Sequence, residues 1–232
     1  MFEPGHNQSP FNDIPPVIVG LVAIVGLIEL VFQAGAAGLA GGPNGVGWRI
    51  DAIERFGFFD TVFDWMRETG NWPLEGLVRF LTYPFVHFGG MHALLAAVLL
   101  LAMGKFVAER FAVASVLAIM AFSSIAGALA YGLLVDENMP LLGLYPAVYG
   151  LIGAFTFVML LFYEATGQNR ARAFQMIGIL VGLQLIFNMM GGGAKEWIAD
   201  TAGFIAGFTL SFAMAPDGIR RLRQLLDKSR QR

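Results

Sequence analysis

The chain has 232 residues, of which 56% are hydrophobic and only 14% are charged, and its formal net charge is −2. This composition excludes an ordinary soluble domain and predicts an all-α membrane protein with several spanning helices. The sequence has no basic patch with interleaved aromatic residues, so we expect no nucleic acid among its partners. It also has no cysteine, which excludes disulfides and thiolate metal sites.

Six apolar segments are long enough to cross roughly 30 Å of hydrocarbon. They run from about 17 to 39, 89 to 107, 113 to 135, 146 to 162, 173 to 190 and 197 to 215. We expect one six-span domain over residues 17–215, with a short N-terminal segment 1–16 and a basic tail 216–232. The first apolar run is too long for a signal-peptide core, so it is predicted to be a span.

A long connection, residues 40–88, follows the first predicted span. Its apolar residues recur every three or four positions, as Ile53, Phe56, Phe59, Phe63 and Met66 show. Charged residues occupy the other positions, which is the pattern of an amphipathic helix, and Gly57 interrupts it. We expect this loop to lie in the membrane interface, where tryptophan side chains also concentrate.

The basic residues predict the orientation. An even number of spans places both termini on one side of the membrane. The lysines and arginines fall on that side, except for Arg49, Arg55, Arg67, Arg79 and Lys195. By the positive-inside rule, both termini are expected to be cytoplasmic, in a bacterial inner membrane.

The second span is approached through Arg-Phe-Leu-Thr-Tyr-Pro-Phe-Val-His-Phe-Gly-Gly-Met-His, residues 79–92. This block ends in two histidines, His87 and His92, and Ala96 follows His92 by four residues. Four residues are about one helical turn, so Ala96 and His92 are expected on one helix face.

The fourth span begins within Gly-Leu-Tyr-Pro-Ala-Val-Tyr-Gly-Leu-Ile-Gly, which contains Tyr145, Pro146, Tyr149, Gly150 and Gly153. Proline is well tolerated in a first helical turn, because its missing N–H would have no partner there in any case. Pro146 therefore marks the start of a helix. We expect Tyr149 to lie in the core.

The sixth span contains Ala-Asp-Thr-Ala-Gly-Phe-Ile-Ala-Gly, residues 199–207. Gly203 and Gly207 are four residues apart, a spacing that lets a helix approach its neighbour closely. An ionisable group inside a span is costly unless it is paired. We expect Asp200 to be buried and paired.

Together these blocks resemble the rhomboid family of intramembrane serine proteases over about residues 77–215. The resemblance implies a six-helix rhomboid-like bundle with a structured loop after the first helix. In that family the nucleophilic serine, the catalytic histidine and an oxyanion-binding asparagine belong at the positions of Tyr145, Asp200 and Ala96. The resemblance also implies that Gly150 and Gly153 pack against the glycines of the sixth span, and that Asp200 pairs with His92 and Tyr145.

These three replacements remove the groups that serine hydrolysis requires, namely an activated hydroxyl, an imidazole base and donors to the oxyanion. A phenol, with a pKa of about 10, is a poor nucleophile at neutral pH, and a carboxylate of pKa about 3.9 is a poor base for it. We therefore expect no catalytic residues and a rhomboid-like pseudoprotease. Its vestigial site consists of His87, His92, Tyr145, Pro146, Tyr149 and Asp200.

Two other chemical hypotheses are weaker. A displaced serine site would have to use Ser115, Ser123, Ser124 or Ser211, and none of these has a histidine near it in sequence. A metal site would have to combine His87, His92 and Asp200, but two histidines five residues apart do not share a helix face well. We expect neither metal nor cofactor.

A rhomboid-like fold without catalysis is expected to bind the transmembrane helices of client membrane proteins, in regulation, escort or quality control. The expected partners are therefore other membrane proteins and the lipid bilayer. The alternative is a fixed accessory subunit of a larger membrane complex. An active protease is the least favoured hypothesis.

Overall fold

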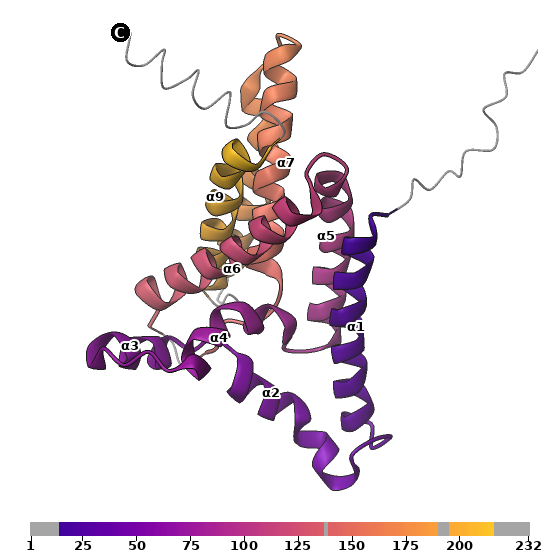
Figure 1. Ribbon diagram of the computed structural model, residues 1–232, viewed down its shortest axis with the longest axis vertical. Helices are drawn as coiled ribbons and strands as arrows, with labels where there is room; N and C mark the ends of the chain where they lie inside the picture. The colour runs from indigo at the N-terminus through magenta and orange to yellow at the C-terminus, as the bar shows by residue number, and fades with distance from the viewer. Residues whose placement is uncertain (1–13, 137–138, 190–194, 216–232) are drawn as a thin grey trace, which may run out of the picture.

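The computed structural model describes residues 14–136, 139–189 and 195–215 (Figure 1). The predicted segments 1–16 and 216–232 therefore lie wholly or almost wholly outside the described residues. The long helices are α1 (Pro16–Ala36), α5 (Gly90–Ala108), α6 (Val113–Leu134), α7 (Tyr145–Ala165), α8 (Gln175–Met189) and α9 (Glu196–Met214).

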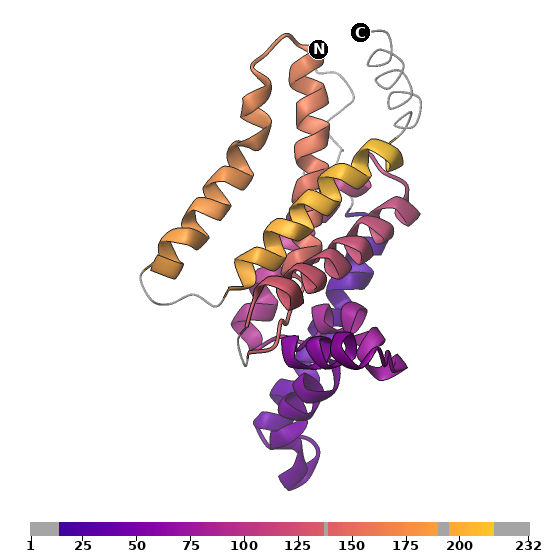
Figure 2. The same cartoon turned by 90° about the vertical axis from the view of Figure 1, so that its left-hand side faces the viewer.

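Five of these helices, all except α8, are long and apolar enough to cross a membrane. Their bounds lie within a few residues of the predicted segments, because continuous apolar runs bounded by polar or glycine-rich turns define spans well. The predicted segment 173–190 forms α8, whose 15 described residues are mostly apolar but fewer than a perpendicular crossing requires. A short turn, η3 (Arg170–Phe174), joins α7 to α8, and Figure 2 shows the two helices as an antiparallel pair.

Between α1 and α5 the chain forms a series of short helices. They are η1 (Gly42–Gly47), α2 (Trp48–Phe56), α3 (Asp60–Thr69), α4 (Leu74–Thr82) and η2 (Tyr83–Phe85). The helical pattern stops at Gly57, as predicted, where a Cβ would lie 2.6 Å from the carbonyl oxygen of Ile53. Beyond it, Phe63 and Met66 of α3 are buried, and the Phe63 ring contacts Phe58 and Phe80. The apolar residues of this segment thus form a second core cluster together with Ala128 and Tyr131 of α6.

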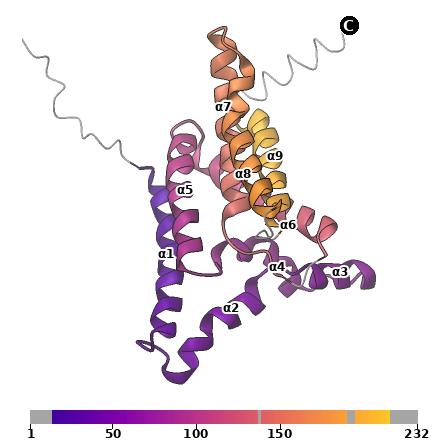
Figure 3. The same cartoon turned by 180° about the vertical axis from the view of Figure 1, so that it is seen from behind.

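α7 lies at the centre of the bundle and packs against α5, α6 and α9. It is the most buried of the five candidate spans. Its most extensive interface is with α9, and the pair is visible side by side in Figures 1 and 3. On the opposite side of the molecule, α1 runs alongside α5.

Glycines let α7 and α9 approach each other. A Cβ at Gly207 would overlap the backbone carbonyl of Gly150, and one at Gly203 would overlap that of Pro146. From the α7 side, a Cβ at Gly153 would overlap the Phe204 carbonyl and lie 2.6 Å from the Phe208 nitrogen. Backbone atoms cannot rotate away as side chains do, so this close approach requires glycine. We refer to Gly150, Gly153, Gly203 and Gly207 as the glycine seam.

Candidate functional site

The site forms where the loop before α7 meets the loop before α5. Gly143 has a φ of 88°, in the left-handed region, and its N–H donates to the carbonyl of Tyr83 at 3.0 Å. A Cβ at Gly143 would lie 2.9 Å from Cε1 of His92, so only glycine fits this turn without a shift. Pro146 follows in the first turn of α7. The N–H groups of a first turn have no partner within the helix, so the absence of an N–H in proline costs no helical hydrogen bond there.

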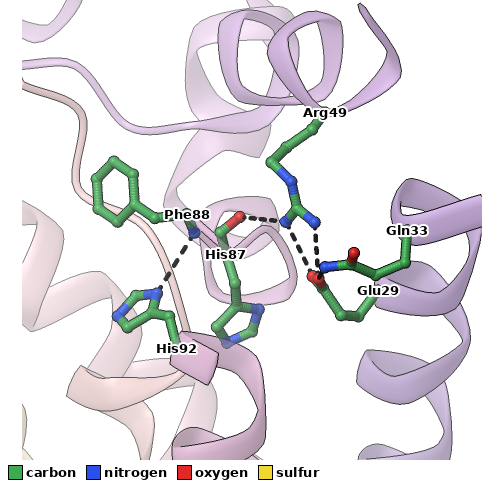
Figure 4. Close-up of polar contacts among 6 residues, drawn as sticks. All are labelled: Glu29, Gln33, Arg49, His87, Phe88 and His92. Atoms are coloured by element: carbon green, nitrogen blue, oxygen red, sulfur yellow. Dashed lines mark hydrogen bonds and ion pairs between the residues drawn. The ribbon is translucent and has the colours of Figure 1, made fainter. Parts of the chain in front are cut away.

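Tyr145, at the start of α7, lies against His92 of α5. Their rings are stacked, with centroids 4.8 Å apart and planes 21° apart. The Tyr145 hydroxyl donates to the backbone carbonyl of His92 at 3.3 Å. His92 Nδ1 in turn accepts from the N–H of Phe88 at 3.4 Å (Figure 4). Both side chains are therefore held through ring stacking and backbone groups.

His87 is almost fully buried, with 1% of its surface exposed. Its Nε2 accepts from the N–H of Leu144 at 3.4 Å, so the proton of the neutral ring is on Nδ1. Burial, and then the neighbouring His92, lower the pKa of His87 from 6.5 to about 4. His87 is thus a neutral imidazole that fixes the backbone just before α7.

An ion pair between Arg49 and Glu29 lies beside the backbone carbonyl of His87 (Figure 4). Arg49 of α2 donates to the carbonyl of His87 at 2.9 Å and pairs with Glu29 of α1 at 2.6 Å. Gln33, one turn along α1, also donates to Glu29, at 2.8 Å. This group links α1, α2 and the approach to α5, and sequence reasoning missed it. The only signal is a glutamate inside an apolar span, which requires a partner.

Asp200 of α9 is buried, with 3% of its surface exposed. We expected it to pair with His92 and Tyr145, but its hydrogen-bond partner in the structure is Gln184 of α8, whose Nε2 donates to Oδ2 at 2.7 Å. Oδ1 has no hydrogen-bond partner among the described residues. The expectation was wrong because Tyr145 and His92 bond to backbone and stack on each other, while α8 brings an amide donor to Asp200.

The other predicted positions lie within the bundle. Ala96 is fully buried one turn after His92, and its methyl group offers no hydrogen-bond donor. Tyr149 is buried in the main apolar core, one turn after Tyr145. The resemblance places both residues beside the position of the family's catalytic centre.

No serine hydroxyl donates to an imidazole in the described part of the chain. Ser115, Ser124 and Ser211 bond to the backbone carbonyls of Met214, Met120 and Gly207. The Ser123 hydroxyl has no bond and lies against Gly150. The ranges with described placement also contain no group of three or more His, Cys, Asp or Glu that could hold a metal ion. His87, His92 and Asp200 are therefore not arranged as a metal site.

Several apolar helices of spanning length around a buried polar centre define an integral multi-pass membrane protein. The family model described as the Rhomboid domain matches residues 74–217, which is more than half of the chain. The protein belongs to the rhomboid family, which includes proteases. The matched region begins at α4 and ends just after α9, so it contains His87, His92, Tyr145 and Asp200, whereas the Glu29–Arg49 ion pair lies before it. The comparison with curated proteins finds no match.

Proposed function

We propose that this member of the rhomboid family is not a protease and that it binds the transmembrane helices of other membrane proteins. The observation that carries the proposal is the hydrogen bond made by the Tyr145 hydroxyl. Tyr145 occupies the position where the family resemblance places the nucleophile, and its hydroxyl donates to a backbone carbonyl rather than to a base.

The surroundings of Tyr145 support the loss of catalysis. A serine-type mechanism requires a general base within hydrogen-bond reach of the nucleophile. Asp200 stands where the family histidine belongs, and its bond is to Gln184. Pro146 has no N–H and Ala96 has no side-chain donor, so two sources of oxyanion stabilisation are missing.

The surface of α8 supports a helix-binding role. α8 packs mainly against η3 and α9, and Ile179 and Leu183 of α8 are 63% and 48% exposed. Ile205 of α9 is also 55% exposed. In a bilayer such surfaces meet lipid or another helix, and van der Waals packing between helices drives association there. We propose that a client helix docks along α8.

We further propose that α8 is a sixth span and that both termini lie on the cytoplasmic side of a bacterial inner membrane. α8 is apolar, and tilting or local thinning of the bilayer accommodates a short span. With six spans, the basic residues gather on the side of the termini, as the positive-inside rule requires. Modification of single engineered cysteines from either side of the membrane tests this topology, since the natural chain has no cysteine.

Site-specific photo-crosslinking in cells tests helix binding. A photo-reactive amino acid replaces Ile179 or Leu183 of α8, and a matched probe replaces Leu95 of α5, which is 52% exposed. We expect crosslinks to several membrane proteins from α8, each at less than one copy per chain, and few from α5. A single partner at a fixed ratio would contradict client binding and favour an accessory subunit. A fluorophosphonate probe should not label the protein, and labelling that disappears with one serine substitution would contradict the loss of catalysis.

A further inference from the structure

An apolar cavity of about 450 Å³ lies between α1, α2, α4 and η2. Its walls include Ile28 and Phe32 of α1, Phe56 of α2 and Phe85 of η2. Its one polar side chain is Thr82, whose hydroxyl lies 3.1 Å from the carbonyl oxygens of both Phe56 and Val78 and is turned toward the backbone. The cavity therefore offers nothing for water to bond. Figure 1 shows α1, α2 and α4 around this part of the molecule.

A second cavity has a volume of about 290 Å³. It is lined by residues of α1, α6 and α7, including Leu21, Met120 and Ala147, and Phe85 lines both cavities. Leu21 and Ile28 are seven residues apart, so they lie on the same side of α1, about 10 Å apart along its axis. The two cavities thus follow one face of α1 from its C-terminal half toward its N-terminal half.

Positive charge lies at the α2 end of this path. The guanidinium of Arg55 is exposed and sits 5.5 Å from the ring centroid of Phe56, which lines the first cavity. Arg79 donates to the carbonyl of Gly57, next along the chain, at 2.6 Å. Glu54 and Glu75 are the acidic residues nearest to them in sequence, but in the described parts of the chain neither arginine forms an ion pair.

We propose that these cavities hold one acyl chain of an anionic phospholipid, with its phosphate at Arg55. The first cavity is half open at the protein surface, and a bilayer supplies acyl chains that can pack against its apolar walls. Arg55 lies beside Phe56 of the first cavity, and the second cavity is lined by α6 and α7 of the bundle, so the path has a cationic end and an apolar end, as a lipid molecule does. A transmembrane helix of a partner protein would be about 10–12 Å across with its side chains. It is therefore too wide to enter these cavities, which share the Phe85 side chain as a wall. This inference does not depend on the proposed function.

Native mass spectrometry tests the site. The full-length protein is equilibrated with mixed micelles that contain equal parts of phosphatidylglycerol and phosphatidylcholine. We expect the parent to retain one phosphatidylglycerol in preference to phosphatidylcholine. Arg55→Gln should weaken the retention of phosphatidylglycerol about fivefold, because one arginine near an anionic headgroup contributes about that factor. Ala52→Phe, which fills the first cavity from α2, should abolish it.

Two control variants test whether a loss of lipid binding is specific to the cavities. Arg110→Gln removes another arginine stacked on a neighbouring phenylalanine, Phe106, but one that lies beside Glu109 and away from the cavities. Ala102→Phe adds the same ring on the exposed side of α5. Both should bind like the parent. If Ala52→Phe does not fold, Val31→Trp blocks the rim at a residue that is 52% exposed.

Three results would overturn the proposal. The first is equal retention by the parent, the cavity-filling variants and the controls. The second is a loss in Ala52→Phe that Arg55→Gln does not share, which would show an apolar ligand without a phosphate contact. The third is equal binding of phosphatidylcholine and phosphatidylglycerol by the parent.

Discussion

A single methyl group at Gly207 should push α9 away from α7. A Cβ there would lie 2.5 Å from both the Cα and the carbonyl carbon of Gly150, whereas ordinary van der Waals contact is 3.4 to 4 Å. Overpacking of this kind costs about 1–3 kcal/mol, and the value should fall near the upper end because the neighbours are backbone atoms. Alanine is a better helix former than glycine by about 1 kcal/mol. We therefore expect Gly207→Ala to lower the free energy of unfolding by about 2 kcal/mol.

The matched control is Gly26→Ala on α1, where no atom lies within 4 Å of the added Cβ. Only helix propensity acts there, so this variant should gain up to about 1 kcal/mol. Gly38 is unsuited as a control, because its φ of 71° strains any other residue. Unfolding in one detergent, followed by circular dichroism, gives the comparison. If Gly207→Ala unfolds at or above the temperature of Gly26→Ala, the close approach of α7 and α9 is not a determinant of stability.

Three further predictions concern the polar centre. Gln184→Leu should leave the Asp200 carboxylate without its donor and lower the free energy of unfolding by about 1–3 kcal/mol, measured in the same detergent assay. Unchanged stability would show that Asp200 has another donor. Tyr145→Ser combined with Asp200→His should not cleave a transmembrane reporter substrate, because Ala96 and Pro146 still supply no donor to an oxyanion; cleavage products on a gel would contradict this. Because the pKa of His87 is lowered in the folded protein, the unfolded chain binds a proton at this residue below about pH 6.5. The folded chain binds it only below about pH 4. Stability should therefore fall by up to about 3 kcal/mol as the pH drops through this window. His87→Gln should reduce that slope in melting temperatures recorded from pH 7 to pH 4.5, and the neighbouring His92 accounts for the remainder.

The spans could be predicted from the sequence because each is a continuous apolar run. The second predicted segment, 89–107, differs from α5 by one residue at each end. α8 is less well defined, because residues 170–174 form η3, which shortens the helix from its N-terminal end. Local hydropathy does not distinguish a 3₁₀ turn from the first turn of a helix. The ends of a helix are therefore predicted less accurately than its presence.

Close helix approach could also be predicted, since glycines at four-residue spacing have few other uses in a span. The hydrogen-bond partner of Asp200 could not be predicted from the sequence. Gln184 is 16 residues away in sequence, and its bond depends on how α8 is rotated and placed against α9. No local pattern encodes that rotation. The same holds for Glu29 and Arg49, which meet only because α2 folds back against α1.

The backbone bonds of the loop before α7 constrain the order in which the protein can form. Phe58 and Leu141 exchange two backbone hydrogen bonds, at 2.8 and 3.3 Å, and Gly143 donates to Tyr83 at 3.0 Å. These partners are separated by about 60 to 80 residues, and α5 and α6 lie between them in the chain. The segment between α1 and α5 therefore cannot complete its hydrogen bonding during synthesis until two later helices and the loop after α6 have been made. A nascent chain that ends within α6 lacks the Leu141 partner of the Phe58 N–H and carbonyl, so this segment is expected to reach its final structure late, after the helices that follow it have entered the membrane.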